Sequence, residues 1–194
     1  MQRLRDLLET HPNIEDDLIT HPFPASVMHR EADIVLREFE IGHERLIRRK
    51  IARLGVSFYA SRDYAERRLL PEHREDWKVH KVIAFADQAS NAELGRWSDK
   101  VAHHSTVPLR CASQSENSAA ARSSVGICAL TCFVGNPYGD PIRVAPRRLL
   151  GVSNVWLLVR PDFAKLPATR AVVDFVAAAS ARTDKVVLPG RVFG

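Results

Sequence analysis

The stretch IRRKIARLGVSFYASRDYAER, residues 47–67, decides the fold because it joins a long extended segment directly to a helix. From Leu54 to Phe58 apolar residues alternate with small or polar ones, which is the period-two pattern of a β-strand. Ser61 follows, and serine is a favoured helix N-cap. We therefore predict a strand over 47–60 and a helix over 61–68.

Short apolar runs and helical stripes continue on both sides of this stretch. Strands are predicted at 14–19, 34–36, 82–85, 107–111, 127–130 and 155–159. Helices are predicted at 4–8, 94–101, 116–122 with Ser115 as cap, and from 167 to 182, with an extended tail beyond. Strands that alternate with helices favour an α/β fold with a mostly parallel sheet, in which ligands bind beyond the carboxyl ends of the strands.

The composition is that of an ordinary globular protein: 194 residues, 45% hydrophobic and 26% charged. No apolar run reaches the roughly 18 residues of a membrane span, and the first residues lack the apolar centre of a secretion signal. A cytoplasmic protein is therefore expected. An odd number of cysteines, Cys111, Cys128 and Cys132, favours reduced thiols over disulfides.

The net charge of +5 raises the question of a nucleic-acid partner. Basic residues crowd only one stretch, 45–53, and no helix-turn-helix, zinc-finger or aromatic RNA-binding pattern lies beside it. A solvated basic face is therefore a better explanation of this charge than direct DNA binding.

Seven stretches, in this order, resemble the effector-binding (substrate-binding) domain of LysR-type transcription regulators. They are HPNIEDDLI (11–19), EADIVLREFE (31–40), RRKIARLGVSFYASRDYAERRLLPE (48–72), WKVHKVIAFAD (77–87), AELGRWSDKV (92–101), RSSVGICALTCFVGN (122–136) and VWLLVRPDFAKLPATRAVVDFVAAA (155–179). Each stretch is weak alone, but seven in the family's order over most of the chain are hard to obtain by chance.

The resemblance implies an α/β fold of two Rossmann-like lobes, of the periplasmic-binding-protein type, joined by two crossing segments. Lobe I would comprise 1–48 with 152–194, and lobe II 49–151. The family holds a small organic effector in the cleft between the lobes, and a carboxylate is one candidate for the effector here. Occupancy shifts how the domains pair, because a ligand favours the arrangement that it binds better. The implied protein partners are a homo-oligomer or related regulators.

On this resemblance seven residues would contact the effector: Thr20, His21, Arg37, Phe85, Asp87, Ser113 and Gln114. Arg37 suits a carboxylate because a guanidinium group donates two parallel hydrogen bonds. Thr20 and Ser113 offer hydroxyl groups, and Phe85 offers an apolar cover. Two alternatives stay open: a surface pairing of Arg37 with Glu38 or Glu40, and an exposed loop position for His21.

The chain also departs from the family pattern. The family usually has glycine where Ser124 stands, asparagine at Ala112, proline at Thr131, and apolar residues at Gln114 and Asn117. The sequence starts inside the family's first helix, so the first strand of lobe I and the DNA-binding domain are expected to be missing. We expect a sensor of a truncated regulator or, alternatively, a stand-alone or decaying fragment that pairs with intact regulators without binding DNA itself.

Catalytic patterns are weak by comparison. Cys128 and Cys132 lie four residues apart on a predicted strand, about 13 Å, which is too far for one tetrahedral metal. Nothing like GxSxG, a P-loop or GxGxxG is present. We therefore expect no enzyme, no cofactor and no metal.

Overall fold

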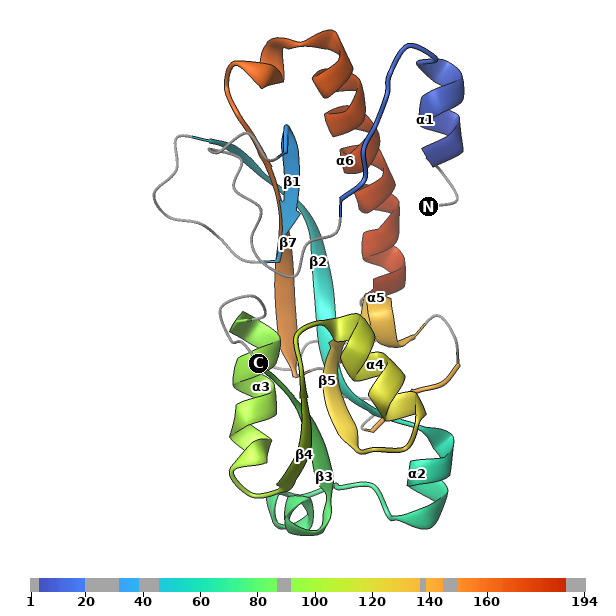
Figure 1. Cartoon of the computed structure of the whole chain (residues 1–194), viewed down its shortest axis with the longest axis vertical. Coiled ribbons are helices and arrows are strands. Elements are labelled where there is room, and N and C mark those ends of the chain that lie inside the picture. Colours follow the sequence, from blue (N-terminus) through green and yellow to red (C-terminus); the bar gives the residue numbers. More distant parts are fainter. Residues whose placement is uncertain are drawn as a thin grey trace. The chain divides into compact units, whose positions relative to one another are not determined.

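The structure is a computed structural model that describes residues 4–19, 32–38, 46–86, 92–136, 139–144 and 150–187. They fall into two compact units. Unit 1 holds the described residues of Met1–Arg53 and Asn154–Val186, and unit 2 those of Leu54–Ser153 and Val187–Gly194. Strands β2 (Ile47–Ala60) and β7 (Gly151–Val159) each contribute residues to both units (Figure 1). The lobes drawn from the sequence, 1–48 with 152–194 and 49–151, stay a prediction.

The sheet of unit 2 is organised around β5 (Ile127–Thr131). On one side β5 pairs in parallel with β3 (Lys81–Phe85), which in turn pairs in parallel with β4 (Thr106–Cys111). On the other side β5 pairs antiparallel with β2, and β2 also pairs with the short β6 (Ile142–Arg143). The order is therefore β2-β5-β3-β4.

Helices cover both faces of this sheet (Figure 1). Helix α3 (Ala92–Ala102) packs on a core cluster that contains Phe58, while α4 (Gln114–Arg122) packs on a second cluster that contains Tyr59. Successive residues of a strand point to opposite faces, so two neighbours on β2 belong to different clusters. Tyr59 is fully buried, and its hydroxyl donates to Oδ1 of Asn136 at 2.7 Å.

The helix ends of unit 2 follow from side-chain capping. Ser61 caps α2 (Arg62–Arg67) by accepting from the Tyr64 N–H at 3.0 Å, which confirms the cap predicted from the sequence. The prediction of Ser115 as the cap of α4 was wrong. Ser113 is the cap, and it forms a capping box with Glu116 at the Ser-x-x-Glu spacing.

Beyond α4 the chain turns at Ser124, whose φ of 61° is left-handed. Its hydroxyl donates to the Asp63 carboxylate and lies 2.8 Å from the Ser61 hydroxyl. These bonds connect the end of α4 to the beginning of α2.

Two further short elements complete unit 2. The 3-10 helix η1 (Arg74–Val79) precedes β3, and α5 (Cys132–Gly135) follows β5 without a break. Trp77 anchors η1, since its ring lies 4.7 Å from that of Phe58 in the core.

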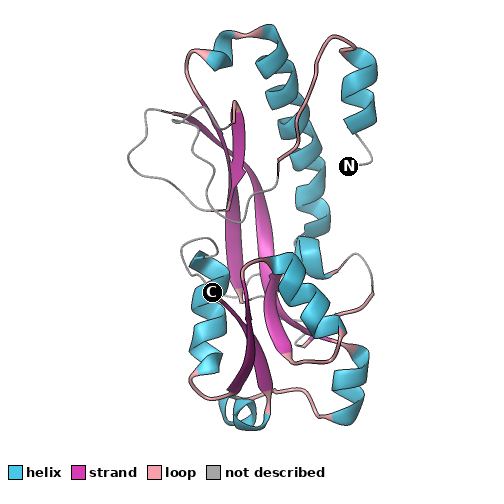
Figure 2. Ribbon diagram, viewed as in Figure 1, coloured by secondary structure: helices cyan, strands magenta, loops and turns pink. Residues whose placement is uncertain are grey.

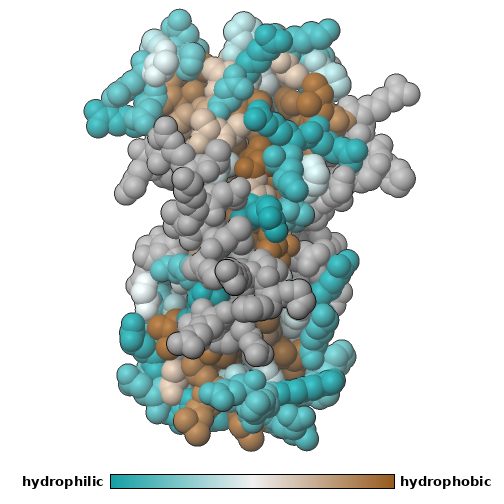
Figure 3. Space-filling view, turned by 180° about the vertical axis from the view of Figure 1, so that it is seen from behind, coloured by the Kyte–Doolittle hydropathy of each residue, from teal (hydrophilic) through white to brown (hydrophobic). Residues whose placement is uncertain are grey.

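Among the described residues, unit 1 buries fewer apolar side chains than unit 2. Strand β1 (Ile34–Arg37) pairs antiparallel with β7, and the two strands bury Val35 and Leu158. Helices α1 (Leu4–Thr10) and α6 (Pro167–Val187), with the 3-10 turn η2 (Phe163–Lys165), complete its described elements. Apolar atoms reach the surface of this unit among hydrophilic ones (Figure 3).

The strands predicted at 34–36, 47–60, 82–85, 107–111, 127–130 and 155–159 are confirmed. The strand at 14–19 was wrong: this segment is irregular, with Leu18 66% and Ile19 64% exposed (Figure 2). Three consecutive acidic residues, 15–17, explain the difference, because aspartate and glutamate are poor strand formers. Helix α6 also continues to Val187, beyond the predicted end.

The mostly parallel sheet was wrong as well. The pairs β1/β7, β2/β5 and β2/β6 are antiparallel, whereas β3/β4 and β3/β5 are parallel. A strand buried on both faces is apolar along its length in either direction, so composition does not reveal pairing direction. Within the described residues, no helix is both long enough and apolar enough to cross a bilayer.

His80 gives the fold a pH dependence. It is 2% exposed, and its Nδ1 lies 3.1 Å from the Tyr64 hydroxyl, which accepts from the Lys81 N–H. Burial, followed by the charge of Arg68, lowers the pKa of His80 below its ordinary value. The unfolded chain therefore binds a proton at a higher pH than the folded chain, and stability falls as the pH drops below about 6.5.

We expect His80→Gln to flatten the loss of unfolding free energy between pH 7.5 and pH 5, measured by chemical denaturation at each pH. His11→Gln, at an exposed histidine, is the control and should keep the wild-type slope. Equal slopes for wild type and His80→Gln would contradict the assignment.

Candidate functional site

The candidate site of unit 2 lies at one edge of its sheet. Because β3, β4 and β5 are parallel, their carboxyl ends meet at the same edge, which is where ligands bind in such folds. We call the residues that end these strands and begin α4 and α5 the carboxyl edge. The structure brings Phe85, Ser113 and Gln114 together there. The Ala86 N–H donates to the Cys111 carbonyl at 2.9 Å, which joins the ends of β3 and β4 at this edge.

Gln114 connects α4 to the end of β5. Its Oε1 accepts hydrogen bonds from the N–H of Thr131 at 3.0 Å and from the Thr131 hydroxyl at 2.9 Å. These are the two positions at which the family usually has an apolar residue and proline. The two positions thus differ from the family pattern together, and the amide oxygen of Gln114 is hydrogen-bonded within the protein.

Glu116 makes the beginning of α4 negative. Its Oε2 accepts from the N–H groups of Ala112 at 2.8 Å and Ser113 at 3.1 Å, while Ser113 Oγ accepts from the Glu116 N–H at 3.2 Å. The amides of a helix N-terminus ordinarily attract anions. Here a carboxylate of the chain already occupies that place, so this edge favours neutral or donor groups of a ligand over a carboxylate.

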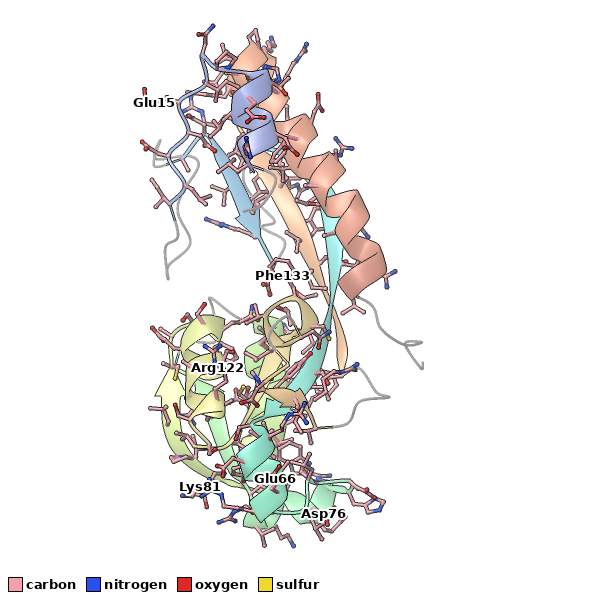
Figure 4. All side chains as sticks on the ribbon, turned by 90° about the vertical axis from the view of Figure 1, so that its right-hand side faces the viewer. Glu15, Glu66, Asp76, Lys81, Arg122 and Phe133 are labelled. Atoms are coloured by element: carbon pink, nitrogen blue, oxygen red, sulfur yellow. The ribbon has the colours of Figure 1, made fainter. Side chains whose placement is uncertain are left out.

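The two aromatic residues of the carboxyl edge differ in exposure. Phe85 is 2% exposed and belongs to the core cluster under α3, so its ring supports the edge from inside the protein. Phe133, in α5, is 57% exposed (Figure 4). Phe133 was not predicted from the sequence, although its position three residues after the apolar run 127–130 places it near a strand end.

Arg37 is the candidate residue of unit 1. It ends β1 opposite Trp156 and is 9% exposed, and its pairing with Glu38 or Glu40 stays an alternative prediction. Charges attract more strongly where water is excluded, so a carboxylate held by this guanidinium group would be bound firmly. Thr20, His21 and Asp87 lie outside the described residues.

Asn117 is a second residue that the sequence analysis did not select. It lies on α4, is 0% exposed, and neither its Nδ2 nor its Oδ1 has a hydrogen-bond partner. A buried polar group without a partner costs about 1–3 kcal/mol. An apolar residue, as the family usually has here, would avoid this cost.

Among the described residues, the cysteine thiols are poor candidates for a reactive group. Cys111, Cys128 and Cys132 are free thiols. Burial raises the pKa of Cys128 and of Cys111, and the charge of Glu116 raises that of Cys111 further. Such thiols stay protonated and are poor nucleophiles. Across the described parts of the chain, no three His, Cys, Asp or Glu side chains are grouped to hold a metal.

Comparison with known proteins gives one family. The sequence profile described as "LysR substrate binding domain" matches residues 1–181. Among curated proteins, the uncharacterized HTH-type transcriptional regulator YhjC of Escherichia coli is 27% identical over 95 residues, which is 49% of this chain and 32% of that protein. The match thus spans about a third of that relative's length.

Solved structures share the fold at low identity. The regulatory domain of CrgA, a LysR-type transcriptional regulator from Neisseria meningitidis, has a TM-score of 0.79 at 18% identity, covering 92% of this chain and 90% of that one. The effector domain of AmpR from Pseudomonas aeruginosa has a TM-score of 0.75 at 17% identity, covering 95% and 90%. The predicted two-lobed α/β fold of the periplasmic-binding-protein type is confirmed.

The unsatisfied amide of Asn117 leads to a stability prediction. Asn117→Leu has nearly the same shape and removes the buried polar atoms, so the free energy of unfolding should rise by about 1–3 kcal/mol. Asn136→Leu is the matched control. It leaves the buried Tyr59 hydroxyl without its acceptor and should lower stability. Denaturant titration measures both variants, and a loss of stability in Asn117→Leu would show that the amide has a partner in solution.

Proposed function

Because this chain belongs to the LysR substrate-binding domain family, we propose that it senses a small organic carboxylate for a transcription regulator. The family comprises the effector-binding domains of LysR-type regulators, so the role of the chain is regulatory. The observation that carries the choice of ligand is Arg37, an arginine that is 9% exposed at the end of a strand.

Arg37 binds the carboxylate in this proposal. A guanidinium group offers two parallel N–H donors that match the two oxygens of a carboxylate, a geometry that lysine lacks. In unit 2, the carboxylate of Glu116 at the beginning of α4 would repel an anionic group.

On the resemblance, the contacts in unit 2 would be neutral groups. The hydroxyl of Ser113 keeps its hydrogen for a ligand, because its oxygen accepts from the Glu116 N–H. The amide group of Gln114 lies beside it, and the exposed ring of Phe133 offers apolar cover in place of the buried Phe85. Thr20, His21 and Asp87 are proposed contacts on the resemblance alone.

A thermal-shift screen of small organic acids tests the proposal. A ligand at about 100 times its Kd stabilises the folded state by about 2.7 kcal/mol, which raises Tm by roughly 5–10 °C in a chain of this size. Arg37→Lys keeps the charge but loses the planar fork, so the ligand-induced shift should fall by more than half. Each variant is compared with its own ligand-free Tm.

Arg5→Lys, at an arginine whose side chain is 82% exposed, is the control and should respond like the wild type. No shift with any acid at millimolar concentration, in protein shown to be folded, would refute sensing. An undiminished shift in Arg37→Lys would refute only the role of Arg37.

Transcription is reached in this proposal through a DNA-binding domain, either of the same protein or of an intact regulator with which the chain pairs. Regulators of this family act on DNA as oligomers. The chain covers 62% of the longer CrgA structure. Its own basic stretch supports an indirect route, because Arg49 and Lys50 lie on β2 and not on a recognition helix.

We expect the 194-residue chain to sediment as a dimer or larger oligomer and not to shift a labelled DNA duplex at about 0.15 M salt. Analytical ultracentrifugation and an electrophoretic mobility assay measure the two properties. A duplex shift that disappears in a variant with glutamine at both Arg49 and Lys50 would instead establish direct DNA binding through β2.

A further inference from the structure

A second polar site lies at the other edge of unit 2. A surface pocket of about 330 Å³ is lined by Arg74, Glu75, Lys78 and His104. Lys78 shortly precedes the first residue of β3, and His104 shortly precedes the first residue of β4. The pocket therefore lies at the amino ends of the parallel strands, whereas the proposed effector contacts of unit 2 lie at their carboxyl ends. Figure 4 shows Asp76, which belongs to the same helix η1.

The helix that carries three of these residues is held firmly. Trp77 fixes η1 in the core, where it is 8% exposed. The Asp76 carboxylate accepts from the N–H groups of Glu72 at 3.0 Å and His73 at 2.8 Å, and these bonds lower its pKa. The Asp76 carboxylate is thus hydrogen-bonded to the backbone, and Arg74 and Lys78 extend from a helix that is held in place.

Arg74 and His104 form an unusual contact. Both Nε and Nη2 of Arg74 point at the single Nε2 of His104, at 3.2 and 2.8 Å. A guanidinium group can only donate, so Nε2 of His104 acts as the acceptor in this contact. Two donors that match two oxygens of an anion therefore converge on one nitrogen lone pair, which makes His104 a weak substitute for an oxyanion.

The other groups of the pocket favour an anion. Arg74 and Lys78 carry two positive charges against the single negative charge of Glu75. The carbonyls of Asp99, Val101 and Ala102 at the end of α3 accept from the N–H groups of residues 103–105. Their lone pairs are thus directed into the turn.

We propose that this pocket binds a phosphate monoester of a small organic molecule. Arg74 turns its Nε and Nη2 donors from His104 to two phosphate oxygens, and Lys78 supplies the second charge. The volume of about 330 Å³ leaves room for the ester group beside the phosphate.

Calorimetric titration with methyl phosphate and with inorganic phosphate, at about 0.15 M salt, tests the site on the full chain. Methyl phosphate should bind and Arg74→Gln should weaken binding at least tenfold, while Glu75→Gln should strengthen it severalfold by removing the opposing charge. Arg5→Gln removes the same charge from unit 1 and should leave the affinity unchanged. Stronger binding of inorganic phosphate than of methyl phosphate would overturn the choice of ester.

Nitrogen-15 NMR of the histidine side chains gives an independent readout. Free protein should show His104 with its proton on Nδ1, and methyl phosphate should shift the Nε2 resonance as Arg74 leaves. No heat of binding at about 10 mM ligand, or equal weakening by Arg74→Gln and Arg5→Gln, would overturn the proposal. These outcomes do not affect the proposal that Arg37 binds a carboxylate, since Arg37 does not line this pocket.

Discussion

Strand β5 has no residue exposed to solvent, so each amide and carbonyl along it must find a partner within the protein. It therefore needs a strand on both sides, and it has β2 antiparallel on one and β3 parallel on the other. The parallel partner in turn places β4 and sets both edges of unit 2. The carboxyl edge with Ser113 and the amino-end pocket with Arg74 are thus two results of satisfying one buried backbone.

The sequence predicted most of the helices and strands, but not which face each side chain lies on. Period-two alternation located β2 to the residue, because alternation is a local property. The face of Phe85 was not predictable, since Val82 and Phe85, three residues apart on β3, belong to the same core cluster, which strict alternation would not give. On α4 the buried face was not predictable either, since the polar residues Asn117 and Ser118 are buried beside Ala121. Only the packing partners reveal that rotation.

The same contrast applies to the candidate site. The resemblance identified Arg37 and Ser113, while the charge at the beginning of α4 became visible only with the bonds of Glu116. That carboxylate changes the chemistry expected of the effector, because it makes one helix end acceptor-rich where such ends usually bind anions. The proposal that an anionic group of the effector binds only at Arg37 depends on the hydrogen bonds of Glu116, which the amino-acid sequence alone does not show.

Ser124 has a consequence for how this protein changes over evolutionary time. A left-handed serine carries backbone strain that glycine avoids, and here hydrogen bonds to Asp63 and Ser61 offset that strain. Serine is therefore favourable only where both partners are present, and glycine only where they are not required. The three positions therefore depend on one another: a serine at 124 without Ser61 and Asp63 would carry the backbone strain without the bonds that offset it.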